Sequence, residues 1–191
     1  MSRTGTTSLF QLMEALGFKS RHFFGELIAD PDWNIPEDLQ MLNDSPVPML
    51  YKQLDKKYPG SKFILTTRDK KTWLESMKWM FTHGMVIWNW APGIHEYHKK
   101  FYHTSRYNKR ILSRKYDDFH NEVKDYFKDR PNDLLTINID KGIDIPIVCR
   151  FLNIPVREVS FPKTNERKYA TLRERLQYNW NYMVYGTNDN L

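Results

Sequence analysis

The segment that most constrains this chain lies at its start, where residues 2–8 read Ser-Arg-Thr-Gly-Thr-Thr-Ser and lead into an apolar helical pattern. Backbone N–H groups at the beginning of a helix have no partner within the helix, and their dipoles attract an anion. Gly5 lets the backbone approach such an anion closely, and Arg3 adds a permanent positive charge with a forked geometry. Further hydroxyl donors come from Thr6, Thr7 and Ser8. The segment therefore predicts a phosphate-binding loop.

This loop differs from the nucleotide-hydrolase loop G-x-x-x-x-G-K-[ST], because Thr6 directly follows Gly5 where that motif has a lysine. A nucleotide kinase or other P-loop phosphotransferase, which would depend on ATP and magnesium, is therefore the less favoured alternative. A purely structural interpretation also stays open. In that interpretation the amino terminus is disordered and the helix after it is capped by Thr4 or Thr6.

Composition indicates a folded chain, and its positive charge suits an anionic ligand or a solvated lysine-rich surface. The 191 residues, 40% of them hydrophobic and 15% aromatic, suit a single domain over residues 1–191. The formal charge of +6 leaves a basic nucleic-acid-binding module without catalysis as a second alternative. Cys149 is the only cysteine, which excludes an internal disulfide and a cysteine-based metal site. No apolar run reaches membrane-spanning length and no signal peptide is visible, so we expect a cytoplasmic protein without a membrane partner.

The hydrophobic pattern predicts strands that alternate with helices. Residues 62–67 form the clearest strand, because their nearly continuous apolar and β-branched run indicates burial on both faces. We expect a second strand over 134–139 and a short one over 19–24. Helices are expected over 6–16, 49–58, 70–81, 105–129, 143–152 and 166–185, with helical turns at 37–42 and loops or short helices at 82–102. This order predicts a three-layer α/β/α fold with a mainly parallel central sheet.

The start of the chain poses a problem for this fold. A phosphate-binding loop normally follows the carboxyl end of a buried strand, but only Met1 stands before Ser2. We therefore expect the fold to lack its first strand in this chain.

Three separated segments resemble a known family. Residues 3–7, Arg-Thr-Gly-Thr-Thr, resemble the sulfotransferase loop that holds the 5′-phosphosulfate of 3′-phosphoadenosine 5′-phosphosulfate (PAPS). Residues 67–76, which begin Thr-Arg-Asp and include Trp73, resemble the segment that holds the 3′-phosphate, with a serine eight positions after the arginine. Residues 161–165, Phe-Pro-Lys-Thr-Asn, following Phe-Leu-Asn-Ile-Pro at 151–155, resemble the carboxyl-terminal signature of one branch. The chain thus resembles the PAPS-dependent sulfotransferases and their P-loop-like architecture.

The resemblance implies an enzyme that moves a sulfuryl group from PAPS to a hydroxyl or amine of a small-molecule acceptor, leaving adenosine 3′,5′-bisphosphate. It implies no nucleic-acid partner. Arg3 and the amides of residues 5–7 would stabilise the bridging and 5′-phosphate oxygens, and Arg68 and Ser76 would anchor the 3′-phosphate. A structural ion pair is the alternative role for Arg68. The expected donor-binding residues are Arg3, Thr4, Gly5, Thr6, Thr7, Ser8, Arg68 and Ser76.

The chain departs from cytosolic members of the family at three places. Arg3 stands where many of them have lysine, and Ser8 stands where they have a ring that stacks on the adenine. The region of their catalytic histidine holds residues 43–46, Asn-Asp-Ser-Pro. We therefore predict Asp44 as the base and Arg3 as the second catalytic residue, with His83 as the runner-up base. A turn or cap role for Asp44 stays open.

Other features leave several alternatives. No metal is expected, because arginines supply the positive charge, and His95 and His98 are expected at the surface rather than as zinc ligands. The rings of residues 79–102 are candidates for an acceptor pocket or for core. A non-catalytic member that keeps only the fold is a third alternative. The acceptor and the oligomeric state stay open, as does a further phosphate contact from Lys163, Arg167 or Lys168.

Overall fold

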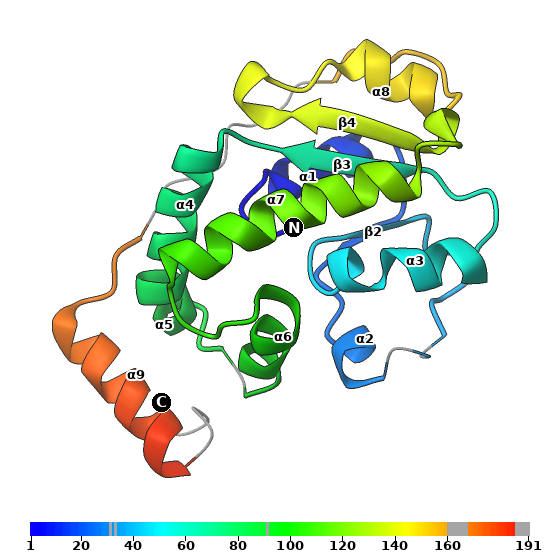
Figure 1. Ribbon diagram of the computed structural model, residues 1–191. Coiled ribbons are helices and arrows are strands. Elements are labelled where there is room, and N and C mark those ends of the chain that lie inside the picture. The colour runs from blue at the N-terminus through cyan, green and yellow to red at the C-terminus, as the bar shows by residue number, and fades with distance from the viewer. Residues whose placement is uncertain (31, 33, 91, 160–167, 186–191) are drawn as a thin grey trace. The chain divides into compact units, whose positions relative to one another are not determined.

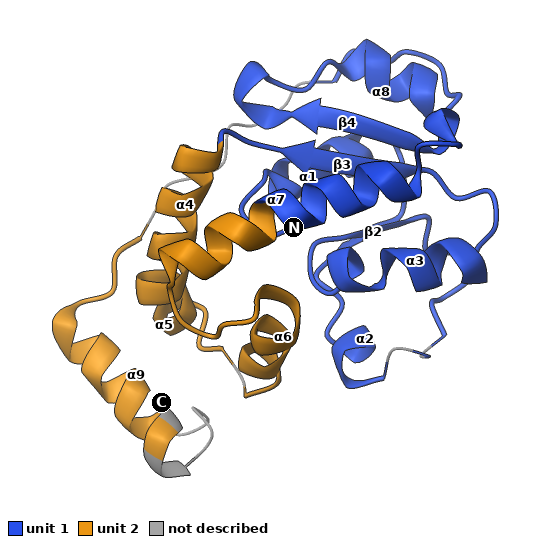
Figure 2. Ribbon diagram, viewed as in Figure 1, with its two compact units in different colours: residues 1–69, 117–164 blue, residues 70–116, 165–191 orange. Residues whose placement is uncertain are grey.

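The computed structural model describes residues 1–30, 32, 34–90, 92–159 and 168–185 (Figure 1). These residues form two compact units, one of residues 1–69 and 117–164, the other of residues 70–116 and 165–191 (Figure 2). The first unit contains α1 (Thr6–Ala15), β1 (Ser20–His22), α2 (Glu26–Ala29), β2 (Met41–Asn43), α3 (Val47–Lys57), β3 (Phe63–Thr67), η2 (Pro131–Asp133), β4 (Leu134–Asn138), η3 (Ile139–Lys141) and α8 (Ile145–Phe151). The second contains α4 (Lys70–Trp79), η1 (Met80–Gly84), α5 (Met85–Ile87), α6 (Pro92–Tyr102) and α9 (Leu172–Tyr185). The long helix α7 (Lys109–Tyr126) contributes its first part to the second unit and the remainder to the first.

The strands of the first unit form two parallel pairs. β1 lies beside β2, with Ser20 opposite Met41, and β3 lies beside β4, with Phe63 opposite Leu134. The predicted α/β class with parallel strands is therefore confirmed. The helical turns predicted over 37–42 are wrong, because Met41 begins a strand that the carbonyl of Lys19 helps to hold against β1.

Helices pack on both faces of the β3–β4 pair within this unit. On one face Leu9, Leu12 and Met13 of α1 and Leu16, which follows it, form a core with Ile137 of β4 and Val148 and Cys149 of α8. Their spacing of three and four residues places them on a single face of α1. Because side chains alternate along a strand, Ile64 packs on that core while Phe63 meets the ring of Phe127 at 4.9 Å on the other face. This packing fixes the carboxyl end of β3, where the candidate site begins.

The second unit has a core of aromatic rings. Trp73, Tyr97, Phe101 and Tyr102 are all buried. Trp73 packs at a tilt against Tyr116, Phe101 meets Tyr102 edge-on, and Tyr97 stacks on Phe101. Of the two interpretations left open for the rings of residues 79–102, most of those described here serve the core. Trp88 is an exception, with 48% of its surface exposed. The helix expected over 70–81 ends at Trp79, and a π-helix continues from it to Gly84.

The surface position expected for His95 and His98 is wrong. Only 5% of His95 and 3% of His98 are exposed. His95 Nε2 lies 2.8 Å from the hydroxyl oxygen of Tyr178, and the ring of His98 lies 4.4 Å from that of Trp90. Burial lowers the pKa of His95, and it lowers the pKa of His98 to about 3. Both imidazoles are therefore neutral parts of the core at physiological pH.

Within the described parts of the chain, none of the helices has both the length and the apolar character that crossing a bilayer requires.

Candidate functional site

The carboxyl ends of the four strands in the first unit meet the first six residues of the chain. Asn43, the last residue of β2, donates from Nδ2 to the carbonyl of Thr6 at 2.8 Å. His22, the last residue of β1, brings Nε2 within 3.4 Å of the hydroxyl of Thr6. Ile139 follows β4 and contacts the backbone at Gly5. In open α/β folds ligands bind at the carboxyl ends of the strands, so this edge is the candidate site.

Thr4 connects the loop to β3. Its side chain is completely buried, and its hydroxyl donates to the carbonyl of Met1 at 2.6 Å. Because that bond uses the single hydroxyl hydrogen of Thr4, the contact of 2.8 Å with Thr66 must be donated by the Thr66 hydroxyl. Thr66 stands two positions before Arg68. The two segments predicted to hold the two ends of one donor molecule therefore come together at this strand end.

Gly5 has a conformation that only glycine adopts without strain. Its φ is 84°, and a Cβ atom built on it would lie 2.9 Å from Cγ2 of Ile139. Both the backbone conformation and the close approach to η3 therefore require the absence of a side chain. Arg3 also has a positive φ, of 66°, so the loop turns sharply twice within three residues.

The first turn of α1 presents backbone donors. The earliest hydrogen bond at this end runs from Leu9 N to the carbonyl of Gly5 at 2.9 Å, so the N–H groups of Thr6, Thr7 and Ser8 have no acceptor within the helix. Gly5 has no side chain with which to cap them, and the first turn carries no acidic residue. Thr7 is exposed, and Thr6 and Ser8 are half-buried. These three residues can therefore donate to an anion as the sequence predicts.

Asp44 lies beside the same loop. Its backbone has a φ of 66°, and Oδ1 accepts a hydrogen bond of 3.2 Å from the hydroxyl of Ser2. Oδ2 lies 3.4 Å from Nε2 of His22. Asp44 and His22 thus form an acid–imidazole pair that also reaches Thr6. Sequence reasoning did not select His22, although its position near the end of the short strand expected over 19–24 was an available signal.

Arg68 forms an ion pair. Its Nε lies 3.4 Å from Oδ1 of Asp140, which follows β4, and the side chain of Arg68 is 24% exposed. The other oxygen of Asp140 accepts a hydrogen bond of 2.6 Å from the backbone N–H of Asp69. The structural ion pair considered as an alternative is therefore present. It holds the guanidinium at the strand edge where the phosphate role would also place it.

The remaining predicted residues belong to the second unit or lie outside the described residues. Ser76 is completely buried within α4. His83 Nδ1 lies 3.3 Å from the carbonyl of Ala170, and the carbonyl of Lys168 accepts a hydrogen bond from Trp79 Nε1 at 2.8 Å. The residues outside the described part are the 161–165 signature with Lys163, and Arg167.

Comparison with known proteins identifies the family. The family model for the sulfotransferase domain matches residues 32–170 of the 191. The chain belongs to the sulfotransferase domain family. The matched range includes Asp44, Arg68 and Ser76, and it begins after the loop of residues 2–8. None of the curated proteins compared with the chain matches it.

Membership of the sulfotransferase domain family makes the chain a transferase whose general chemistry is sulfotransfer. Such chemistry requires donors for a charged leaving group, a positive charge near it and a base for the acceptor. The edge formed by the loop, Arg68 and the Asp44–His22 pair contains each of these types of group. Within the described residues, no group of three His, Cys, Asp or Glu side chains could hold a metal ion.

Proposed function

We propose that this sulfotransferase domain transfers a sulfuryl group from PAPS to a hydroxyl or amine of a small-molecule acceptor. The observation that carries the proposal is the hydrogen bond between Thr4 and Thr66, at 2.8 Å. It joins the loop that is suited to a 5′-phosphosulfate to the strand that ends in Arg68, which is suited to a 3′-phosphate. A donor with anionic groups at both ends of an adenosine matches two such sites better than a nucleotide with a single polyphosphate does.

The loop residues fit a phosphosulfate. Gly5 has no side chain at a position where Ile139 leaves no room for one. The backbone N–H groups of Thr6, Thr7 and Ser8, at the start of α1, can donate to an anion. Arg3 adds the permanent charge that would stabilise the leaving 5′-phosphate. In this proposal Thr4 positions the loop, because its buried hydroxyl is already bonded to Met1 and Thr66.

Arg68 would contact the 3′-phosphate while Asp140 holds its Nε side. Guanidinium groups bind phosphate through several N–H donors at once, which suits Arg68 to a 3′-phosphate. We also propose Ser76 as the second ligand of the 3′-phosphate, a role that the family resemblance implies. Its complete burial in α4 means that the serine must become accessible before it can reach a phosphate.

The proton of the acceptor would go to the Asp44–His22 pair. When bound, PAPS would supply the sulfuryl group, whose bond to the 5′-phosphate breaks as the acceptor oxygen or nitrogen bonds to sulfur. Asp44 Oδ1 is held by Ser2 and Oδ2 faces His22, so the carboxylate is fixed beside Thr6. We assign the role of base to Asp44, and His22 positions it.

The finer architecture is proposed on the same contacts. We propose a single three-layer α/β/α domain in which the β1–β2 and β3–β4 pairs belong to one mainly parallel sheet. Ser2 bonds to Asp44 after β2, and Thr4 bonds to Thr66 in β3, so residues 2–4 bridge the two parallel pairs.

A thermal unfolding experiment tests the donor. A ligand that binds only the folded protein raises the melting temperature, so adenosine 3′,5′-bisphosphate should stabilise the protein more than AMP, ADP or ATP with magnesium. Arg68→Met should remove the preference for the bisphosphate over AMP. The matched control is Arg110→Met, which removes an exposed arginine from the start of α7.

The other outcomes identify the alternatives. A preference for ATP with magnesium would overturn the proposal in favour of a phosphotransferase. Salt-sensitive binding to oligonucleotides, without preference for the bisphosphate, would favour a nucleic-acid-binding module. Preference for the bisphosphate without sulfation of any member of a panel of phenols, alcohols and amines would point to a non-catalytic member.

A further inference from the structure

A pocket lies within the unit of residues 70–116 and 165–191. This pocket, of about 730 Å³, opens between α5 and the start of α9. We call it the α5–α9 pocket. Its lining residues are Val86, Ile87, Lys168, Tyr169, Ala170, Arg173, Glu174 and Gln177. The volume lies within the range of small-molecule sites.

The wall of the pocket is fixed by hydrogen bonds from the helices beneath it. Trp79 Nε1 donates to the carbonyl of Lys168 at 2.8 Å, and His83 Nδ1 lies 3.3 Å from the carbonyl of Ala170. The ring of Tyr169 lies 5.1 Å from that of His83, edge to face. These contacts hold the backbone of residues 168–170, so the pocket does not depend on a ligand to form its wall.

The helix on the other side is held equally firmly. The hydroxyl of Tyr178 lies 2.8 Å from His95 Nε2 and donates to the carbonyl of Trp90 at 3.0 Å, in the core of the same unit. Only 1% of Tyr178 is exposed. α9 therefore cannot shift to close the pocket without breaking a buried polar contact.

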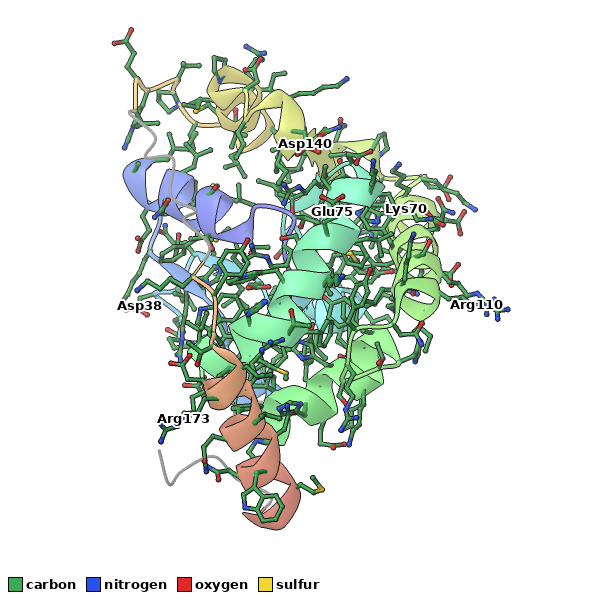
Figure 3. All side chains as sticks on the ribbon, turned by 90° about the vertical axis from the view of Figure 1, so that its left-hand side faces the viewer. Asp38, Lys70, Glu75, Arg110, Asp140 and Arg173 are labelled. Carbon is green, nitrogen blue, oxygen red and sulfur yellow. The ribbon has the colours of Figure 1, made fainter. Side chains whose placement is uncertain are left out.

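The acidic and basic side chains that line the pocket differ in whether they have partners. Glu174 is engaged in a capping box at the start of α9, where its Oε2 accepts from the N–H of Thr171 at 2.6 Å and from its hydroxyl at 2.7 Å. Those hydrogen bonds lower the pKa of Glu174. Lys168 and Arg173 form no ion pair within the described residues, and Figure 3 shows Arg173 projecting outward from α9. Two cations thus border a floor made by Val86, Ile87 and the ring of Tyr169.

We propose that the α5–α9 pocket binds a small amphipathic anion, with an aromatic or aliphatic body against Val86 and Ile87 and a carboxylate, sulfate or phosphate between Lys168 and Arg173. The lining of the α5–α9 pocket shares no residue with the loop or with Arg68, and its occupation does not depend on the proposed sulfotransfer.

Calorimetric titration with three probes of equal shape tests the charge preference. The probes are 4-phenylbutyrate, 4-phenylbutanol and 4-phenylbutylammonium, which share one apolar body and differ only in the head group. We expect the carboxylate to bind about tenfold more tightly than the ammonium compound, with the alcohol between them. Equal affinity for all three, or no binding of the carboxylate, would overturn the proposal.

Variants locate the binding. Arg173→Glu and Lys168→Glu should each weaken carboxylate binding about fivefold or more and reduce the preference over the ammonium compound. Arg110→Glu makes the same change of net charge on an exposed arginine of the same unit and should leave the affinities unchanged (Figure 3). Gln177→Trp fills the pocket from an exposed position of α9 and should weaken all three probes. If Arg110→Glu has the same effect as Arg173→Glu, the preference belongs to the overall charge and the site is refuted.

Discussion

Thr66 donates its hydroxyl hydrogen to Thr4 across 2.8 Å in a buried position, and this single bond ties the first loop to β3. Thr66→Val should remove the donor and leave the Thr4 oxygen with one partner fewer. We expect a loss of about 1–2 kcal/mol in the free energy of unfolding, measured by urea denaturation. Thr136→Val, at an exposed position of the neighbouring strand, is the control and should change stability little. Equal losses in the two variants would show that the bond contributes nothing.

Alanine substitutions at Gly5 and Gly60 should distinguish the cost of backbone strain from the cost of steric overlap. Both have a φ near 85°, but a Cβ at Gly60 would meet no atom within 4 Å, whereas one at Gly5 would press on Ile139. Gly60→Ala should therefore cost about 1 kcal/mol from the conformation alone, and Gly5→Ala about 1–3 kcal/mol more. Urea denaturation of Gly5→Ala in the Ile139→Ala background should recover part of the difference. No recovery would mean that Ile139 is not what restricts the site.

Asp44 and His22 should have separable effects on catalysis. If Asp44 is the base, Asp44→Asn should lower kcat by about 10²–10⁴-fold while the bisphosphate still raises the melting temperature. His22→Gln should lower kcat less and change its dependence on pH, because the carboxylate loses the group that it faces at 3.4 Å. His83→Gln serves as the comparison, and a larger loss of kcat there would move the base to the second unit.

Asp55 should make stability depend on pH in the acid range. It accepts hydrogen bonds from both terminal nitrogens of Arg130, at 3.1 and 2.7 Å, and from Tyr126 at 2.7 Å. These bonds, with that of Arg130 first, hold the pKa of Asp55 below its ordinary value of 3.8. A lowered carboxyl pKa stabilises the fold fully above the unfolded-state pKa, and the contribution is lost as pH falls through the folded-state pKa.

Urea denaturation from pH 7 to pH 2.5 checks this contribution. Asp55→Asn should cost about 1–3 kcal/mol at pH 7, and the difference from the unsubstituted protein should shrink below about pH 4. Asp125→Asn, whose carboxylate pairs with Lys128 at the exposed surface, is the control and should cost less than about 1 kcal/mol. A pH-independent loss for Asp55→Asn would indicate a packing defect instead of a lost charge.

His98 should destabilise the fold in acid. Burial lowers its pKa to about 3, whereas an unfolded chain would titrate near 6.5, so the unfolded state binds one more proton between these values. Stability should then fall by about 1.4 kcal/mol for each pH unit below 6.5 from this residue. His98→Phe keeps a ring beside Trp90 and removes the titrating group, so its stability relative to the unsubstituted protein should rise as pH falls. A constant difference across pH 4–7 would contradict the buried neutral state.

The sequence was most informative where one strong periodicity acts over many residues. The strand expected over 62–67 appears as β3 (Phe63–Thr67), and the helix expected over 6–16 appears as α1 (Thr6–Ala15). Long apolar or amphipathic patterns of this kind are set by burial that the local sequence encodes. The family was also accessible, because the Arg68 segment combines a strand end with the start of a helix, and the match to the family includes it.

Short elements and individual contacts were less predictable. The strand of residues 41–43 contains only three residues, and its pairing with β1 depends on the distant Lys19. His95 and His98 were misplaced because their three-residue spacing on a polar-looking helix does not show that Tyr178, far along the chain, contacts His95 or that Trp90 packs against His98. The Asp44–His22 pair likewise arises from two strand ends that meet only in the fold. Tertiary contacts of this kind leave no local signal.

Asp140 has a consequence for how long a ligand would stay. Its carboxylate already faces Arg68 and is itself fixed by the backbone of Asp69, so an arriving phosphate has to share the guanidinium with a resident negative charge. This sharing lowers the affinity of Arg68 for the phosphate of the donor and for that of the product nucleotide. In transferases whose turnover is limited by product release, a lower affinity for the product raises kcat. We therefore expect Asp140 to lower nucleotide affinity and to speed product release.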